Sequence, residues 1–347
     1  MAAHKRKLPT IKEVARAAGV STSTVSNVLN SRNNSMTAET LKRVQDAMAD
    51  LNYRPSALAR SLVTRETSML GFILSEIEAP LFLQALPHAD LAARGAEYNI
   101  LLSVARSVED EKSAVNLFLE KQADGIVFFS SSEHRKDDFL TELVELGVPT
   151  VLVNRPRQDV QLSKICWDQR GGVAKAVMYL VRLGHRRIAH MLGPESRGST
   201  HEVFQGYRDG LAEAGLEFRD DYIVDGDFTK VSDSWRRSAL KLLSVGNPPS
   251  AVIASDDVVA SIAMRAFQSE GVRIPKDISV VGIDDLPFCP YLNPPLTTVR
   301  LPIRKAGRVA VEMVVDAISQ REIEIKTVTM PCELIERGSC GPYEQTG

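Results

Sequence analysis

The stretch of sequence that decides the fold is TIKEVARAAGVSTSTVSNVLN, residues 10–30. Thr10, followed three residues later by Glu13, forms a capping box, which predicts that a helix begins directly after Thr10. Apolar residues recur at helical spacing as far as Ala18, and Gly19 supplies the left-handed conformation that ends a helix. Ser21 then caps a second helix. The stretch therefore predicts two short helices joined by a glycine turn, the arrangement of a helix-turn-helix.

The second of these helices has an apolar face and a polar face. The apolar face consists of Val25, Val28 and Leu29, at the spacing i, i+3, i+4. The opposite face carries hydroxyl and amide groups on Thr22, Ser23, Ser26 and Asn27. Such side chains hydrogen-bond to base edges without holding the helix away from the major groove, so we interpret this face as DNA-contacting. The alternative is an ordinary solvated surface.

A third helix and a hinge complete the N-terminal module. Thr37 is the predicted N-cap of the third helix, and Asn52 its end. Its apolar stripe is formed by Leu41, Val44, Met48 and Leu51. Residues 53–62, YRPSALARSL, contain good helix starters but are shorter than the roughly 12 residues that an isolated helix needs in water. We expect this segment to become helical on DNA, with Leu62 as an apolar minor-groove wedge. A plain interdomain linker is the alternative.

Positive charge is concentrated at the start of the chain. The whole sequence has 42 Lys and Arg against 44 Asp and Glu, a net charge of −2. Residues 1–65 hold 11 basic and 4 acidic side chains, a net +7, which leaves 31 against 40, a net −9, for the rest. A basic module on an acidic body favours a nucleic-acid-binding head, because phosphate neutralisation is the sequence-independent part of such binding. A merely solvated basic face is the alternative.

Length and composition exclude several classes of protein. The chain of 347 residues is 44% hydrophobic and 25% charged, which is ordinary globular usage for two or three domains. No apolar run approaches the roughly 18 residues of a membrane helix, and the start of the chain lacks an apolar signal core. We therefore expect a cytoplasmic protein with no membrane partner. The four cysteines, at positions 166, 289, 332 and 340, contain no C-x-x-C pair and are expected to be reduced.

After residue 65, short apolar runs alternate with helical stretches. The expected strands are 69–74, 100–104, 125–130, 150–154, 188–192, 251–255 and 278–283. The expected helices lie near 80–97, 110–122, 136–146, 170–183, 202–214, 233–245 and 256–270. This alternation predicts an α/β body, and its length favours two doubly wound parallel-sheet subdomains over one. The fold class is thus a small all-α helix-turn-helix head plus an α/β body.

Ligands of open parallel sheets bind beyond the carboxyl ends of the strands. The polar residues at those positions are Ser75, Glu76, Asn154, Arg155, Asp256, Asp284 and Asp285. Together with the rings of Phe82 and Phe228, they suit a small polyhydroxylated or planar ligand. For each residue, a structural cap or turn is an open alternative. Phosphate-loop, nucleophile-elbow, zinc-protease and dinucleotide motifs are absent from the sequence, so we predict no enzyme, no metal and no cofactor.

Residues 10–30 and 53–62 resemble the DNA-binding head of the lac repressor and galactose repressor family. The resemblance continues through the body in the motifs QADGIVF (122–128), GVPTVLVNRP (147–156), LGHRRIAH (183–190), QGYRDGLAEAGL (205–216), DGDFT (225–229), IPKDISVVGIDD (274–285) and LNPPLTTVRLP (292–302). It implies a body similar to periplasmic sugar-binding proteins, with two α/β subdomains joined by three crossovers. It also implies a transcriptional regulator that is controlled by a small molecule.

The resemblance also implies site residues. The family's base-reading positions correspond to Thr22, Ser23 and Asn27, and its minor-groove wedge corresponds to Leu62. The full set of DNA-contact candidates is Thr10, Thr22, Ser23, Ser26, Asn27, Asn30, Arg32, Tyr53, Ala59 and Leu62. The full set of effector candidates is Ser75, Glu76, Phe82, Asn154, Arg155, His201, Phe228, Asp256 and Asp284. Asn27 and His201 stand where family members often have arginine, and the loop from Ser31 to Met36 is about one residue longer than usual.

The expected domains are a DNA-binding domain over 1–53, a hinge over 54–67, an effector-binding and dimerisation domain over 68–341, and a tail over 342–347. Within the body, subdomain one covers about 68–165 and 292–325, and subdomain two covers 166–291 and 326–341. The expected function is a homodimeric repressor that binds a pseudopalindromic double-stranded operator and responds to a sugar, sugar acid or nucleoside-like effector. The alternatives are a solute-binding protein and a doubly wound sugar-handling enzyme.

Overall fold

The computed structural model describes residues 9–29, 36–54, 66–74, 80–129, 138–155, 159–193, 198–226, 231–320 and 324–344. The chain divides into a head that ends at Thr67 and a body that begins at Ser68. In the described part of the chain, no helix combines the length and the apolar character needed to span a membrane.

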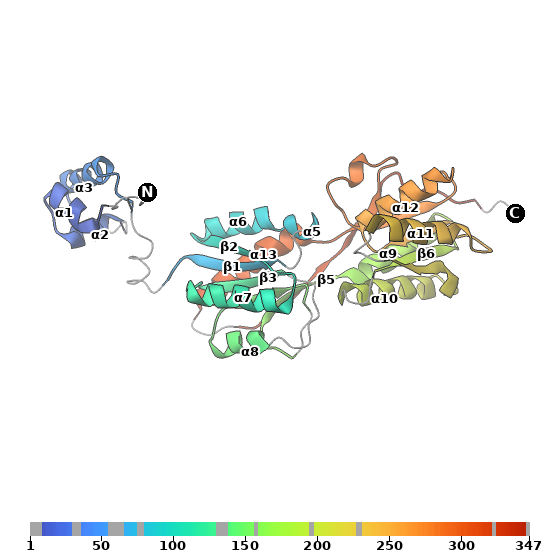
Figure 1. Ribbon diagram of the computed structural model, residues 1–347, viewed down its shortest axis with the longest axis horizontal. Helices are drawn as coiled ribbons and strands as arrows, with labels where there is room; N and C mark the ends of the chain where they lie inside the picture. Colours follow the sequence, from blue (N-terminus) through green and yellow to red (C-terminus); the bar gives the residue numbers. More distant parts are fainter. Residues whose placement is uncertain are drawn as a thin grey trace, which may run out of the picture. The chain divides into compact units, whose positions relative to one another are not determined.

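The described part of the head contains the three expected helices, α1 (Ile11–Ala18), α2 (Thr22–Leu29) and α3 (Ala38–Asp50) (Figure 1). The Glu13 carboxylate accepts a hydrogen bond of 2.6 Å from the backbone amide of Thr10, as a capping box requires. Gly19 has a φ of 65°, which confirms the left-handed turn between α1 and α2. Ser21 Oγ accepts from the Thr24 amide at 3.1 Å, so the second cap is also confirmed.

The head has its own small core. The buried members of this core are Val14, Ala15, Ala18, Val25, Val44 and Ala47. The predicted stripe of α3 contributes Val44 to this core, and Met48 and Leu51 pack against it. Leu41 is only half-buried, and Ala47 supplies an inward position that the predicted stripe did not include.

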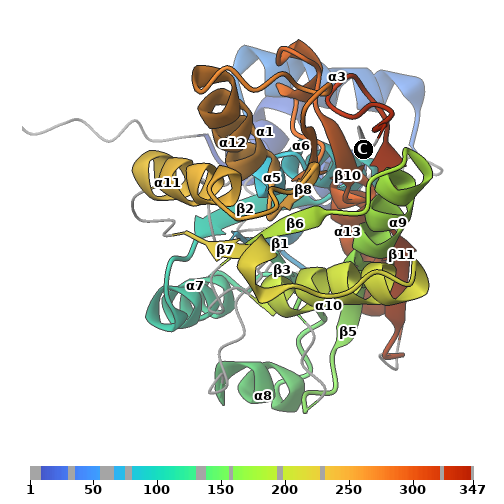
Figure 2. The same cartoon turned by 90° about the vertical axis from the view of Figure 1, so that its right-hand side faces the viewer.

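The body is built on two sheets (Figures 1 and 2). The first contains β1 (Met69–Leu74), β2 (Asn99–Val104), β3 (Gly125–Phe129), β4 (Thr150–Val153), β5 (Ser163–Asp168) and β11 (Thr327–Pro331). The second contains β6 (Ile188–Leu192), β7 (Ile223–Asp225), β8 (Ala251–Ala254), β9 (Ser279–Asp284), β10 (Thr297–Arg300) and β12 (Glu333–Ile335). Among the described residues, the strand orders are β11-β5-β4-β3-β1-β2 and β12-β10-β9-β8-β6-β7. Pairing is parallel except between β10 and β12.

Helices cover both faces of each sheet, which makes the predicted doubly wound subdomains (Figure 1). On the first sheet, one face carries α5 (Pro80–Leu83), α6 (Leu86–Gly95) and α13 (Ile303–Ser319), and the other carries α7 (Val108–Glu120) and α8 (Asp138–Glu145). On the second, α9 (Gln169–Arg182) and α10 (Gly198–Glu213) lie on one face, and α11 (Val231–Leu243) and α12 (Asp257–Ser269) on the other. Short 3-10 turns are η1 (Asp220–Tyr222) and η3 (Cys289–Tyr291).

The helix expected over 80–97 is interrupted after α5 and resumes as α6. Pro87, near the start of α6, has no backbone N–H and cannot donate to the carbonyl four residues earlier. The first turn of a helix tolerates proline and the interior does not, so the break falls just before Pro87.

The chain passes between the two sheets three times, as the resemblance implies. It crosses after β5, between β10 and α13, and between β11 and β12. The predicted boundaries need correction at each crossing: β5 continues in the first sheet through Asp168, β10 belongs to the second sheet, and β11 belongs to the first. Strands β10 and β11 are short and rich in threonine, so their apolar pattern was too weak to place them.

Candidate functional site

Helix α2 presents the predicted polar face to solvent. Thr22, Ser23 and Asn27 are exposed, whereas Ser26 is half-buried. Val25, on the opposite face, is fully buried in the core of the head. Ser23 Oγ lies 2.6 Å from Ser21 Oγ, so the N-terminal cap of α2 and one residue of its polar face share a hydrogen bond. The helix thus combines a fixed apolar face with small, exposed groups that can donate to and accept from base edges.

The other DNA-contact candidates lie at the margin of the described head or outside it. Thr10 is exposed, and its hydroxyl donates to the Glu13 carboxylate at 2.9 Å. Tyr53 is half-buried and packs against the core of the head. The remaining candidates, Asn30, Arg32, Ala59 and Leu62, lie outside the described residues.

An aromatic cluster lies at the carboxyl ends of two strands of the first sheet. Phe82 is 4% exposed, and its ring meets that of Phe129 edge-on at a centroid distance of 5.8 Å. Phe129 ends β3 and lies 6.5 Å from the ring of Trp167, near the end of β5. The indole Nε1 of Trp167 is buried, with no hydrogen-bond partner among the described residues. Asn154 follows β4 at the same edge of the sheet with a φ of 57°. Among the expected ligand residues, Ser75, Glu76 and Phe228 lie outside the described ranges.

Arg155, a ligand candidate from the sequence, has a structural partner in the first subdomain. Its side chain is 0% exposed and forms a two-pronged ion pair with Glu111 on α7, at 3.1 and 3.0 Å. The guanidinium also lies 5.8 Å from the ring centroid of Phe128. A buried guanidinium needs such a partner, because an unpaired buried charge is strongly destabilising. Arg155 therefore holds α7 to the end of β4.

Two further effector candidates, Asp256 and His201, lie in the second subdomain, one as a helix cap and the other as an exposed side chain. Asp256 is the N-cap of α12, since its Oδ1 accepts from the Val259 amide at 2.8 Å. His201 is exposed on α10. Asp168, beside Trp167, is the N-cap of α9 and accepts from the Gly171 amide at 2.7 Å.

A cavity of about 490 Å³ lies where the crossover segments meet the end of β9. We call it the crossover cavity. Its wall is formed by Gln84, Asp284, Asp285, Leu286, Pro287, Pro290, Arg300, Leu301, Pro302, Ile303, Arg304, Lys305, Pro331, Glu333 and Arg337. Asp284 and Asp285 are the sequence-predicted ligand residues in that wall. The cavity has the size of a small-molecule site and is lined from both subdomains.

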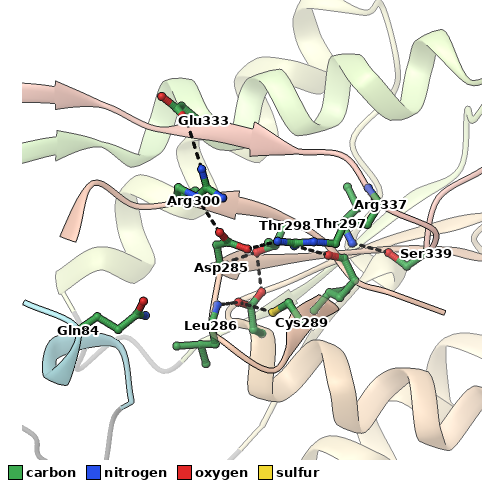
Figure 3. Close-up of polar contacts among 12 residues, drawn as sticks. Gln84, Asp285, Leu286, Cys289, Thr297, Thr298, Arg300, Glu333, Arg337 and Ser339 are labelled. Carbon is green, nitrogen blue, oxygen red and sulfur yellow. Dashed lines mark hydrogen bonds and ion pairs between the residues drawn. The ribbon is translucent and has the colours of Figure 1, made fainter. Parts of the chain in front are cut away.

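A buried carboxylate beside this cavity organises the turn that carries Asp284 (Figure 3). Asp257 is fully buried, and its Oδ1 accepts from Thr298 Oγ1 at 2.6 Å. Its Oδ2 accepts from the Leu286 amide at 2.7 Å and from Cys289 Sγ at 3.0 Å. A Cβ at Gly282 would collide with Oδ1, so β9 passes close to this carboxylate only because it has a glycine there. Sequence reasoning missed Asp257, although it follows the helix cap Asp256 directly.

Ion pairs tie the same turn to the crossover segments (Figure 3). The Asp285 carboxylate accepts from Arg300 Nε at 2.7 Å and from Arg337 Nη2 at 2.5 Å. Arg300 also lies 3.7 Å from Glu333, at the start of β12. Asp285, which the sequence offered as a ligand residue, is thus held by two arginines. Arg300, where the chain makes its second crossing, and Arg337, after the third, are therefore both bound to Asp285, the residue next to Asp284.

Burial gives Asp257 a testable pH signature. Burial raises the pKa of Asp257 to about 7, and the charge of Asp256 acts in the same direction. The folded protein then retains a proton that the unfolded chain releases above its ordinary pKa, so this group's contribution to stability falls between about pH 4 and pH 7. Asp257→Asn removes that fall. The Tm of the variant minus that of the wild type should increase from pH 5 to pH 7.5 in thermal unfolding.

Asp277→Asn is the matched control for this experiment. Arg273 holds the pKa of Asp277 at about 2, so that carboxyl is ionised in both folded and unfolded chains above pH 5. Its Tm difference should stay constant over the same range. A constant difference for Asp257→Asn as well would show that Asp257 is ionised in the folded protein throughout.

The histidines and cysteines have structural surroundings. Burial lowers the pKa of His185 and of His190 to about 4, so both are neutral near pH 7. His185 contacts Ser250 Oγ at 2.9 Å and the Gly341 carbonyl at 3.2 Å, and His190 Nδ1 lies 2.9 Å from the Ile253 carbonyl. The four cysteines are free. Within the described ranges, no cluster of His, Cys, Asp and Glu has the arrangement of a metal site.

Comparison with known proteins follows the division into head and body. A family model described as bacterial regulatory proteins, lacI family, matches residues 10–56. A model of a periplasmic binding protein-like domain matches residues 177–340. The head, and the body from residue 177 onward, therefore each match a family model.

Curated relatives match along nearly the whole chain. The HTH-type transcriptional repressor PurR of Photobacterium profundum is 31% identical over 335 residues, covering 96% of this chain and 98% of that protein. PurR of Vibrio cholerae is 32% identical over 336 residues, covering 95% and 97%. These relatives are transcriptional repressors, which confirms the expectation of a regulator rather than an enzyme.

Solved structures show the same architecture. The lac repressor dimer bound to operator and the anti-inducer ONPF has a TM-score of 0.85 at 28% identity, covering 96% of this chain and 99% of that one. The regulator CelR in complex with cellobiose has a TM-score of 0.70 at 30% identity, covering 95% and 99%. With head, body and full-length relatives in agreement, the chain belongs to the lacI family of bacterial regulatory proteins.

Proposed function

We propose that this protein is a homodimeric transcriptional repressor whose affinity for operator DNA is controlled by a small molecule bound in the body. The observation that carries the proposal is the combination, in one chain, of an exposed hydroxyl and amide face on α2 with a body whose strands end in polar groups around a cavity. A regulator needs both parts, since one reads DNA and the other senses a signal. The cytoplasm is the compartment in which this function would operate.

The proposed DNA-binding mode places α2 in the major groove. Thr22, Ser23 and Asn27 would contact base edges, and the two heads of a dimer would read two half-sites of a pseudopalindrome. The domain division proposed from sequence, 1–53 for the head and 54–67 for the hinge, is retained. In the hinge, Ala59 and Leu62 would contact the minor groove at the centre of the operator.

The proposed effector site lies between the two subdomains of the body. Phe82 lies on α5 with its ring against Phe129 at the end of β3, Asn154 follows β4 in the first sheet, and Asp284 ends β9 in the second. A ligand that contacts both edges would favour one relative arrangement of the subdomains, and this differential affinity is what can change operator binding. The proposed ligand is a sugar, a sugar acid or a nucleoside-like molecule.

Dimerisation should depend on exposed apolar side chains of the body. Leu91 on α6 is 72% exposed and Tyr291 in η3 is 87% exposed, so each presents apolar surface that a second copy of the chain would cover in the proposed dimer. Lac repressor, similar along the chain, is a dimer in its operator complex. Leu91→Glu with Tyr291→Glu should shift the protein to monomer in sedimentation equilibrium, with an unchanged circular dichroism spectrum. Leu146→Glu, at an exposed residue after α8, is the control; an intact dimer in the double variant would place the interface elsewhere.

Selection of DNA from a random duplex library tests the proposed function directly. The full chain should enrich one sequence with two inverted half-sites, and a single unpaired half-site should bind much more weakly. Enrichment of no sequence above background would contradict a role as an operator-binding repressor. Enrichment of direct repeats would contradict the symmetric dimer.

A further inference from the structure

The wall of the crossover cavity has an excess of positive charge. Its cationic side chains are Arg300, Arg304, Lys305 and Arg337. Its acidic side chains are Asp284, Asp285 and Glu333. The distribution of these charges, more than their sum, indicates what the cavity can bind.

Two of the four cations are already neutralised within the wall. Arg300 and Arg337 both donate to Asp285, at 2.7 and 2.5 Å, and Glu333 lies 3.7 Å from Arg300. These four residues form a closed group of two positive and two negative charges. Arg304 and Lys305 remain as the cations of the wall that no carboxylate of the wall neutralises, and Asp284 also lines the cavity.

Arg304 and Lys305 have no acidic partner among the described residues. Arg304 donates only to a neutral group, the Gln84 amide oxygen, at 3.1 and 3.3 Å from its Nη2 and Nε. Lys305 is exposed and forms no ion pair within the described ranges. Both belong to the first turn of α13, which contains no acidic residue, although helix starts favour negative charge.

Gln84 adds an unused donor to this group. Its amide Nε2 is buried without a hydrogen-bond partner among the described residues, while its Oε1 is occupied by Arg304. A buried donor without a partner is unfavourable, and an acceptor in the cavity would satisfy it. Figure 3 shows Gln84 on one side and Asp285 with Leu286 on the other.

We propose that the crossover cavity binds a small hydroxylated anion, a sugar acid or a sugar phosphate, as the effector of this regulator. The acidic group accepts hydrogen bonds from Gln84, Arg304 and Lys305, and hydroxyl groups donate to Asp284. The three donors belong to the first subdomain and Asp284 to the second, so the ligand connects the two. The inference rests on the proposed function, because it names the class of molecule that would control operator binding.

Calorimetric titration of the full-length protein tests the ligand class. The probes are gluconate, glucuronate, glucose 6-phosphate and, as the neutral comparison, glucose. At least one of the acids should bind, and its affinity should fall when the salt concentration rises, since ion pairing contributes to binding. A carboxylate that binds while the phosphate does not identifies a sugar acid, and the opposite result identifies a sugar phosphate.

Variants of α13 connect the binding to this wall. Arg304→Gln and Lys305→Gln should each weaken acid binding about tenfold, and the double variant more. Arg308→Gln is the matched control on the same helix, because Arg308 pairs with Glu312 at 2.7 Å and does not line the cavity. Unchanged affinity in both cavity variants would overturn the proposal, as would binding of glucose alone or of none of the probes.

The same titrations separate this inference from the proposed function. If an acid binds through Arg304 and Lys305 but leaves operator affinity unchanged, the anion site stands and the proposed control of DNA binding fails. If glucose alone binds and shifts operator affinity, the proposed function stands and the anion site fails.

Discussion

Replacement of both Ser23 and Asn27 by alanine should lower specific operator affinity at least about 30-fold, at about 1–3 kcal/mol for each base contact that is lost. Both side chains are exposed on α2, opposite the buried Val25, so truncation removes polar groups without opening the core of the head. Nonspecific DNA binding depends on Lys and Arg contacts to phosphate and should stay within about threefold. Fluorescence anisotropy on operator and on scrambled duplexes at one salt concentration measures both affinities.

Gln45→Ala is the matched control for the double variant. Gln45 is exposed on α3, a different helix from the one proposed to read bases, and its truncation should leave both affinities unchanged. Because Ser23 shares a hydrogen bond with the helix cap Ser21, circular dichroism should confirm that the head of the double variant is folded. Equal losses on operator and scrambled DNA would contradict base reading by α2.

Asp284→Asn should remove most of the response to the effector while preserving operator binding. Asp284 lines the crossover cavity and has a φ of 116°, a conformation that Asn tolerates better than Ala, so this substitution removes the charge with little backbone strain. Loss of a charged hydrogen bond costs about 1.5–3 kcal/mol, which corresponds to a loss of effector affinity of roughly 10-fold to 150-fold. Calorimetry gives the effector affinity, and operator anisotropy without effector gives the preserved function.

The control for Asp284→Asn is Asp220→Asn, at an exposed carboxylate in η1 outside the cavity wall. It should leave both effector binding and operator binding unchanged. An effector affinity that is the same in Asp284→Asn and in wild type would remove Asp284 from the binding site.

The head was predictable from sequence because its signals are local. Thr10 with Glu13, and Ser21 with Thr24, interact across three residues, and Gly19 determines the turn by its own backbone conformation. Strands β1 and β6 coincide with their predicted ranges, since β1 is apolar throughout and β6 is interrupted only by His190. Strands β5, β7, β10, β11 and β12 and helix α13 were not predicted. Strands β7, β10 and β12 have only three or four residues, and β5 and β11 are only partly buried, so their apolar periodicity is weak.

The site depended on contacts that sequence patterns do not encode. Arg155 meets Glu111 across 44 positions of the chain, and Asp257 meets Thr298 across 41. Whether a carboxylate after a strand caps a helix, binds a ligand or holds a turn depends on which distant segment comes to lie beside it. Asp256 and Asp257 come just after β8, and Asp284 is the last residue of β9. Of these three carboxylates, only Asp284 lines the cavity.

The most direct test of the central claim is the operator affinity of one protein preparation with and without a saturating concentration of its tightest-binding sugar acid or sugar phosphate. Effectors of allosteric proteins typically change affinity by about 5-fold to 150-fold. We predict a change of at least about fivefold in the Kd for operator, with little change for scrambled DNA. An identical operator Kd at full occupancy of the cavity would contradict the account.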